Sequence, residues 1–197
     1  MKHNIFGIQT NSDNNKFEDK FECLYEDEGA FYESKETFHH EEEGLVFDYK
    51  FCVEIIDLEY STGEDEDKNK FGIELAIVPM FNSLCEKQKK SVLDCMCVSE
   101  DEVSTYDIYY EGCSVMMGYE EVVVGDDAFE SGEGFEGCKE IKERLDAIAN
   151  VFESINGLRG FYLDKCVNRI GTTGWMLIDA FINGSDWTKA TFDRYKD

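Results

Sequence analysis

The chain has 197 residues and a formal net charge of −25, and residues 1–150 hold essentially all of that excess. A body this negative is repelled by nucleic acid and by anionic membranes, and it is attracted to basic protein surfaces. Hydrophobic residues at 42% and aromatic residues at 14% exceed what a charge-driven disordered chain contains, so we expect the acids on a folded body.

The length of the chain favours one domain over residues 1–197, large enough to bury a core of its own. No apolar run approaches the roughly 18–20 residues that a membrane span needs. The N-terminus lacks the apolar stretch of a secretory signal. These features together predict a cytoplasmic protein.

Residues 1–44 form an acidic and aromatic segment whose order the sequence leaves open. The aromatic side chains indicate that it packs onto something, and the acids indicate that its other side is solvated. Within it, the acidic run from His39 to Glu43 predicts an exposed turn.

The clearest β pattern begins at Phe47, where apolar and polar residues alternate through Ile55. Strict alternation predicts a half-buried strand. The phase then shifts at Ile55–Ile56, which predicts a β-bulge or a bend there. After a polar turn at 61–69 the alternation resumes, so residues 45–79 are expected to form a long hairpin.

The next elements are predicted from a capping motif and from further alternation. Ser83 and Glu86 match the capping box, so we expect a helix over 83–97. Residues 103–110 and 114–124 then read as a second strand pair.

A strong helix is expected over 138–156, because its apolar residues recur at the helical period. That stripe consists of Ile141, Leu145, Ile148, Phe152 and Ile155. On its surface, Glu140 and Arg144 are spaced for an ion pair. Another helix is expected over 173–182 with Trp175 turned inward. The order of elements predicts an α+β fold, in which an antiparallel sheet built from long hairpins packs against amphipathic helices.

The candidate partner-binding residues are acids on the first hairpin strand and in the loops at 61–69 and 125–137. They are Asp48, Glu54, Asp57, Glu59, Glu64, Asp65, Glu66, Asp67, Asp126, Asp127, Glu130, Glu133 and Glu136. Same-face residues on a strand lie about 6.8 Å apart, and each strand of duplex DNA carries one charge per about 3.4 Å of axis. A row of carboxylates is therefore expected to approximate a row of phosphates. The alternative is an ordinary solvated sheet face.

Metal binding and catalysis find weaker support in the sequence. The acidic loops lack the EF-hand pattern, so we expect only weak counter-ion binding there. The eight cysteines contain no CxxC pair and are expected to act as small buried hydrophobes, with a metal site or a reactive thiol as alternatives. Motifs for a serine nucleophile elbow or a zinc protease are absent, and no cofactor or enzymatic activity is expected.

In charge character the chain resembles the acidic antirestriction and anti-CRISPR inhibitors of phages and mobile elements. The acid clusters that carry this resemblance lie at 26–28, 41–43, 64–67, 100–102, 120–121 and 126–136. The resemblance implies a protein that occupies the DNA-binding groove of a nuclease complex. The alternatives are a generic acidic interaction or immunity protein that neutralises a basic partner and, third, a metal-dependent enzyme.

Overall fold

The computed structural model describes residues 3–5, 8–10, 16–27, 29–42, 45–58, 68–96, 103–110, 114–125 and 134–154. These residues divide into two compact units. Unit 1 contains the described residues up to 35, those of 52–75 and those from 118 onward. Unit 2 contains those of 36–51 and 76–117. The expectation of a single domain stays a prediction.

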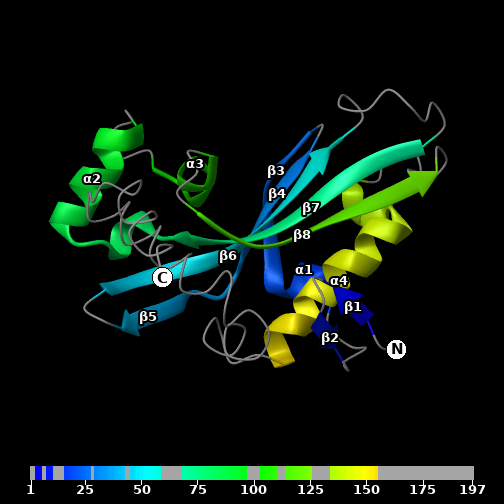
Figure 1. Ribbon diagram of the computed structural model, residues 1–197, viewed down its shortest axis with the longest axis horizontal. Coiled ribbons are helices and arrows are strands. Elements are labelled where there is room, and N and C mark those ends of the chain that lie inside the picture. The colour runs from blue at the N-terminus through cyan, green and yellow to red at the C-terminus, as the bar shows by residue number, and fades with distance from the viewer. Residues whose placement is uncertain are drawn as a thin grey trace, which may run out of the picture. The chain divides into compact units, whose positions relative to one another are not determined.

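The main element is an antiparallel sheet of six strands, in the order β3-β4-β6-β7-β8 with β5 also paired to β6 (Figure 1). Its strands are β3 (Phe21–Glu26), β4 (Ala30–Ser34), β5 (Phe38–Glu42), β6 (Leu45–Asp57), β7 (Lys68–Pro79) and β8 (Val115–Gly125). A separate pair is formed by β1 (His3–Ile5) and β2 (Ile8–Thr10). The α+β class and the 45–79 hairpin are therefore confirmed.

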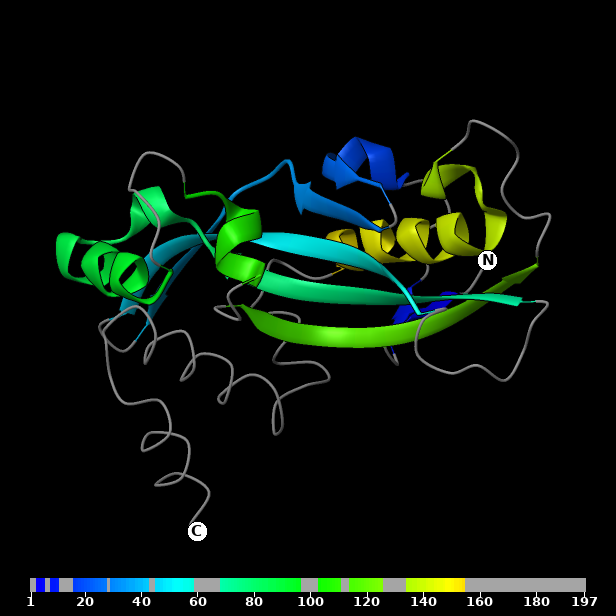
Figure 2. The same cartoon turned by 90° about the horizontal axis from the view of Figure 1, so that it is seen from above.

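In unit 1, α4 (Lys139–Ser154) lies along one face of the strands with α1 (Phe17–Lys20) on the same side (Figures 1 and 2). The first members of the predicted stripe, Ile141, Leu145 and Ile148, are fully buried. A short 3-10 turn, η4 (Phe135–Gly137), precedes α4, and its Phe135 ring meets Phe71 of β7 edge-on at 5.5 Å. The predicted helix is thus confirmed within the described residues.

The middle of β6 is buried on both faces, whereas the alternation predicted burial on one. Phe51 and Val53 are buried as expected, but Cys52 is also fully buried and Lys50 is only 6% exposed. The half-buried strand was therefore wrong for this stretch. Alternation reports the polarity of side chains, and it does not report what covers the second face of a sheet.

The predicted bulge at Ile55–Ile56 is also wrong. The backbone N–H of Leu58 donates to the carbonyl of Lys70 at 2.9 Å, and the N–H of Met80 donates to the carbonyl of Asp48 at 2.8 Å. Both bonds fit one unbroken antiparallel register, so Ile55 and Ile56 lie on opposite faces of the sheet. A register shift occurs instead in β3, between Cys23 and Tyr25.

Unit 2 contains a helix where a strand was predicted. The segment 103–110, which was expected to pair with the strand at 114–124, contains helix α3 (Thr105–Tyr110). Strand β8 is paired with β7. Ser104 and Asp107 form the capping box: the N–H of Asp107 donates to Ser104 Oγ at 3.2 Å, and the N–H of Ser104 donates to the Asp107 carboxylate at 2.8 Å. The alternating aromatic pattern concealed this signal.

The start of α2 (Glu86–Met96) differs from the predicted one. Ser83 lies in a 3-10 turn, η2 (Phe81–Ser83), and its hydroxyl bonds to backbone atoms of Asp48 and Met80. The helix end is closed by Gln88, whose Oε1 accepts a hydrogen bond from the backbone N–H of Cys85 at 2.8 Å. In a capping box the side chain at the third helical position accepts this same bond from the N-cap backbone N–H. Here the bond joins Cys85 and Gln88, two residues after the predicted pair Ser83 and Glu86.

Three remaining expectations concern surface and terminal features. The turn expected at residues 39–43 is wrong, because β5 runs through Glu42. Arg144 pairs with Glu120 of β8 at 3.5 Å rather than with Glu140. The helix expected at 173–182, with Trp175, lies outside the described residues. No helix in the described part of the chain has the length and apolarity needed to cross a membrane.

Candidate partner-binding face

The sheet of unit 1 has one apolar face turned toward α4 and α1. Tyr32 of β4 lies opposite Val53 of β6, both are buried, and the Phe17 ring of α1 meets Tyr32 edge-on at 5.1 Å. Glu120 of β8 reaches Arg144 of α4 on this same side. Residues that alternate with these along each strand must therefore lie on the opposite face.

The opposite face carries a carboxylate on each of β3, β4, β6, β7 and β8, and we call it the acidic face. Its polar members are Glu22, Glu33, Glu54, Lys70, Glu74, Tyr119 and Glu121, and the buried Phe31 and Cys52 lie on the same face. Glu22 and Glu121 are exposed, and Glu33, Glu54 and Glu74 are partly exposed. The alternation of the strands thus separates an apolar face under the helices from an acidic one.

Two pairs of acids on this face lie directly across from each other. Glu22 of β3 is opposite Glu33 of β4 in the register of the sheet. The hydrogen bond between Leu58 and Lys70 sets the β6–β7 register, which puts Glu54 opposite Glu74. Cβ atoms of such pairs are about 4.5–5.5 Å apart, and like charges there destabilise a sheet.

Tyr119 of β8 covers a glycine at the edge of the acidic face. A Cβ atom at Gly72 of β7 would lie 2.8 Å from the Tyr119 ring, so the ring rests directly on the backbone there. Partial burial, followed by the charges of Glu121 and Glu74, raises the pKa of the Tyr119 hydroxyl above 10.0. The tyrosine therefore stays neutral among carboxylates.

Apolar side chains are exposed between these acids. Tyr25 of β3 lies opposite Phe31, which in turn lies opposite Glu54. Tyr25 is 48% exposed, Val123 of β8 is 46% exposed and Tyr119 is 42% exposed. Tyrosine is enriched at protein interfaces because it supplies apolar area together with a polar group.

The structure separates the acids that the sequence grouped together. Glu54 belongs to the acidic face. Asp57 lies on the other face of β6, because the register contains no bulge, and Asp48 lies in unit 2. Glu136 is in η4, and the remaining predicted acids lie outside the described residues: Glu59, Glu64, Asp65, Glu66, Asp67, Asp126, Asp127, Glu130 and Glu133.

Sequence reasoning missed Glu22, Glu33 and Tyr119 as members of this face. The β3 segment contains a register shift between Cys23 and Tyr25, so its alternation is broken. The β4 segment places buried residues on both faces, as Phe31 and Tyr32 show. Neither segment therefore carries the simple period that identifies a strand from its sequence.

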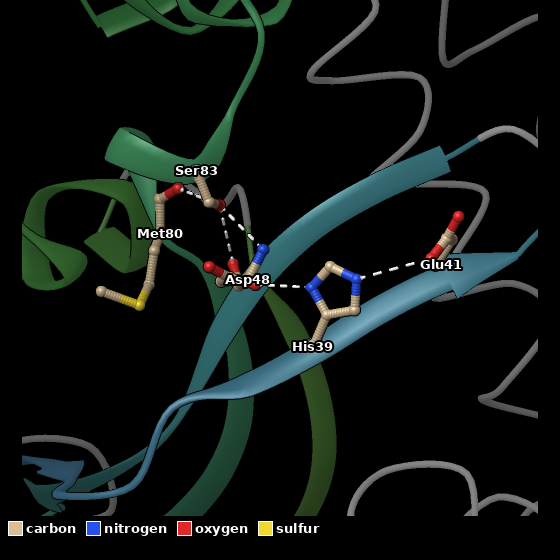
Figure 3. A network of polar contacts seen from close by, with 5 residues as sticks. All are labelled: His39, Glu41, Asp48, Met80 and Ser83. Atoms are coloured by element: carbon tan, nitrogen blue, oxygen red, sulfur yellow. Dashed lines mark hydrogen bonds and ion pairs between the residues drawn. The ribbon is translucent and has the colours of Figure 1, made fainter.

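In unit 2, Asp48 takes part in a separate polar network (Figure 3). His39 of β5 lies opposite Asp48 of β6, and His39 Nδ1 is 2.7 Å from Asp48 Oδ1. His39 Nε2 lies 3.8 Å from a carboxylate oxygen of Glu41. The backbone N–H of Asp48 donates to Ser83 Oγ at 2.8 Å, and Ser83 donates to the Met80 carbonyl at 2.8 Å.

This network contains Ser, His and Asp, but its connections differ from those of a catalytic triad. An activated serine must hydrogen-bond to its base. Ser83 bonds to backbone atoms of Asp48 and Met80, whereas His39 contacts the carboxylates of Asp48 and Glu41. The geometry therefore holds β5, β6 and η2 together and provides no activated nucleophile.

The network makes the charge of His39 dependent on Asp48. The hydrogen bond to the Asp48 carboxylate raises the pKa of His39 above its ordinary value of 6.5. Protonated His39 therefore stabilises the folded protein fully below the unfolded pKa, and this contribution is lost as the pH rises through the folded pKa.

We expect Asp48→Asn to lower the pKa of His39 toward 6.5, measured by NMR titration of the imidazole. Glu41→Gln serves as the control and is expected to shift it less, and equal shifts would contradict this assignment.

The described cysteines divide into two kinds. Cys52 and Cys138 are buried, and burial raises the pKa of the Cys138 thiol, which agrees with a role as a small hydrophobe. Cys23 and Cys85 are exposed and do not fit that role. Among the described residues, no three His, Cys, Asp or Glu side chains gather closely enough to hold a metal ion.

Comparisons of this chain with protein-family models, with curated proteins and with solved structures found no match.

Proposed function

We propose that this protein is an acidic inhibitor that binds a basic nucleic-acid-binding surface, such as that of a nuclease, and excludes DNA or RNA by competition. The observation that carries the proposal is the pairing of like charges across the acidic face. Glu22 lies opposite Glu33, and Glu54 lies opposite Glu74. Such pairs bring negative charges close together on one face, and lysine or arginine side chains of a partner would be attracted there.

The spacing on this face suits a surface that normally holds phosphates. Neighbouring strands lie about 4.8 Å apart, and same-face residues along a strand lie about 6.8 Å apart. Carboxylates on neighbouring strands therefore present negative charge at intervals roughly one and a half to two times the axial charge spacing of about 3.4 Å on a DNA strand. Arginine forms bidentate hydrogen bonds with carboxylate as it does with phosphate, so the same basic groups would recognise both.

A second candidate is a generic acidic interaction or immunity protein, favoured by the exposed apolar side chains on the same face. Tyr25, Tyr119 and Val123 could form a hydrophobic centre that dominates affinity, with the acids tuning only the association rate. The two candidates differ in a measurable way. Phosphate mimicry requires that nucleic acid and this protein compete for one surface on the partner.

The first experiment tests competition. The full chain is immobilised, proteins are captured from host lysate at low salt, and duplex DNA is then added as the competitor. We expect the captured partner to be a nucleic-acid-binding protein that DNA displaces and that raised salt releases, because exposed charges are screened. A partner that binds the protein and DNA together would contradict mimicry and favour the second candidate.

A charge-matched pair of variants locates the binding surface. The first variant replaces Glu22, Glu33, Glu54 and Glu74 by Gln on the acidic face. The control neutralises the same number of acids on the helices: Glu18, Asp19, Glu140 and Glu143. At about 0.2–1 kcal/mol per exposed pair, loss of four pairs in the first variant is expected to lower partner affinity by about fourfold to several hundredfold. Equal losses in both variants would show that net charge alone drives binding.

A further inference from the structure

The edge of the sheet beside the acidic face is formed by β8. Among the described strands, β8 lies at the end of the order and has β7 as its neighbour. We consider the part of β8 within unit 1, residues 118–125. Tyr119, Glu121 and Val123 are exposed there, whereas Val122 and Val124 are buried. An edge strand presents backbone donors and acceptors to any extended chain that approaches it.

The register identifies which backbone groups face outward. Leu58 and Lys70 form a hydrogen-bonded pair, so the even-numbered residues of β7 bond to β6 and the odd-numbered residues bond to β8. Phe71, like other odd-numbered residues of β7, lies on the helix-covered face, where its ring meets Phe135.

Residues of β8 on that same face are the even-numbered ones, as the contact between Glu120 and Arg144 shows. Opposite residues in a sheet share a face, so the even-numbered residues of β8 bond to β7. The N–H and C=O groups of Tyr119, Glu121 and Val123 therefore point away from β7, and these are the residues whose side chains are exposed.

Natural edge strands are commonly protected by lysine, proline or a bulge. The sequence of residues 118–125, Gly-Tyr-Glu-Glu-Val-Val-Val-Gly, contains neither lysine nor proline. Residues 122–124 are three consecutive β-branched valines, which favour strand pairing. The only charges on this stretch are those of Glu120 and Glu121.

We propose that residues 118–125 of β8 receive an extended segment of the basic partner as an additional strand, with lysine or arginine side chains over the acidic face. The inference rests on the proposed function and specifies how the partner is held. An added strand would place alternate side chains beside Glu121 of β8, where positive charge is favoured. Its other contacts would be apolar, with Tyr119 and Val123.

Charge also decides against a second copy of this chain as the occupant. In an antiparallel self-pairing centred on residue 121, Glu121 would face Glu121 of the other copy. Each copy carries a net charge of −25, so the two would repel each other over a longer range as well. A basic strand would be attracted both to Glu121 and to the net negative charge of the chain.

The test uses two short peptides of alternating lysine and valine, both acetylated and amidated, one of them N-methylated at every second residue. Charge and side chains are the same, but the methylated peptide cannot form backbone bonds along one edge. We expect the unmethylated peptide to slow amide hydrogen exchange at Tyr119, Glu121 and Val123 and to bind about tenfold or more tightly than the methylated one. Equal binding would overturn strand addition while leaving charge-driven binding, and hence the proposed function, standing.

A variant pair tests the same edge from the protein side. Val123→Pro removes an outward N–H that β7 does not use, so the fold tolerates it, whereas Val123→Ala removes the side chain and keeps the N–H. Val123→Pro is expected to weaken peptide binding about tenfold, and Val123→Ala about threefold or less. If Val123→Pro does not fold, the methylated peptide decides the question.

Two further outcomes are decisive against the proposal. Slow exchange at Tyr119, Glu121 and Val123 in the free protein would show that another part of this chain, or a second copy, already holds the edge, and sedimentation would distinguish the two. Absence of binding by either peptide would also overturn strand addition. If DNA in addition failed to displace the captured partner, the proposed function would fail with it.

Discussion

Replacing Phe17 by alanine is expected to lower the free energy of unfolding by about 3–5 kcal/mol. The side chain is only 1% exposed, its ring stacks on Phe21 with centroids 4.4 Å apart, and it meets Tyr32 edge-on at 5.1 Å. Helix α1 has four residues, too few to be stable without packing. Loss of the ring would leave a cavity between α1 and the sheet of unit 1. Urea unfolding followed by circular dichroism measures the effect.

Phe17→Leu is the matched control, because it keeps most of the buried volume and is expected to cost less than about 2 kcal/mol. Both variants retain the backbone N–H of Phe17 that donates to Asp146 of α4 at 2.8 Å. Their difference therefore reports packing of the ring alone. A loss below about 1 kcal/mol in Phe17→Ala would be typical of a surface position and would contradict the described core.

Replacing Gly29 by alanine is expected to cost about 1–3 kcal/mol, because overpacked sites must move backbone or side chains. A Cβ atom at Gly29 would lie 2.5 Å from the backbone oxygen of Ile55 in β6. That oxygen belongs to a central strand and cannot move without disturbing its pairing with Ala30. Thermal unfolding of the variant, together with hydrogen exchange at the β4–β6 ladder, measures the loss.

Gly72→Ala provides the comparison for Gly29→Ala. Its Cβ atom would also make a contact of 2.8 Å, but with the ring of Tyr119, an exposed side chain that can rotate away. We therefore expect a smaller loss of stability than at Gly29. If Gly72→Ala were the more destabilising of the two, the Tyr119 ring would be held more firmly than its exposure indicates.

These stability tests bear on function because the acidic face and the core share the same strands. Tyr32 and Val53 lie under the helices, while their neighbours Glu33 and Glu54 lie on the acidic face. The apolar face supplies the burial that holds the strands in place against repulsion between the acids. Variants on the acidic face are therefore expected to fold, which allows binding to be measured separately from stability.

The sequence by itself determined the elements whose pattern is strong and local. The alternation from Phe47 to Ile77 identified the β6–β7 hairpin, and the stripe beginning at Ile141 identified α4. Both patterns arise because each residue's polarity follows its side of the element. The α+β class followed from the order of these elements along the chain.

The tertiary structure decided which residues share a surface. Register is a long-range property, and the pairing of Leu58 with Lys70 places Glu54 opposite Glu74 and turns Asp57 to the other face. Residues 103–110 alternate like a strand, yet the capping box at Ser104 makes them helical. The charge was visible in the sequence. Which of the acids share the face beside β8 depends on strand pairing, which no local pattern encodes.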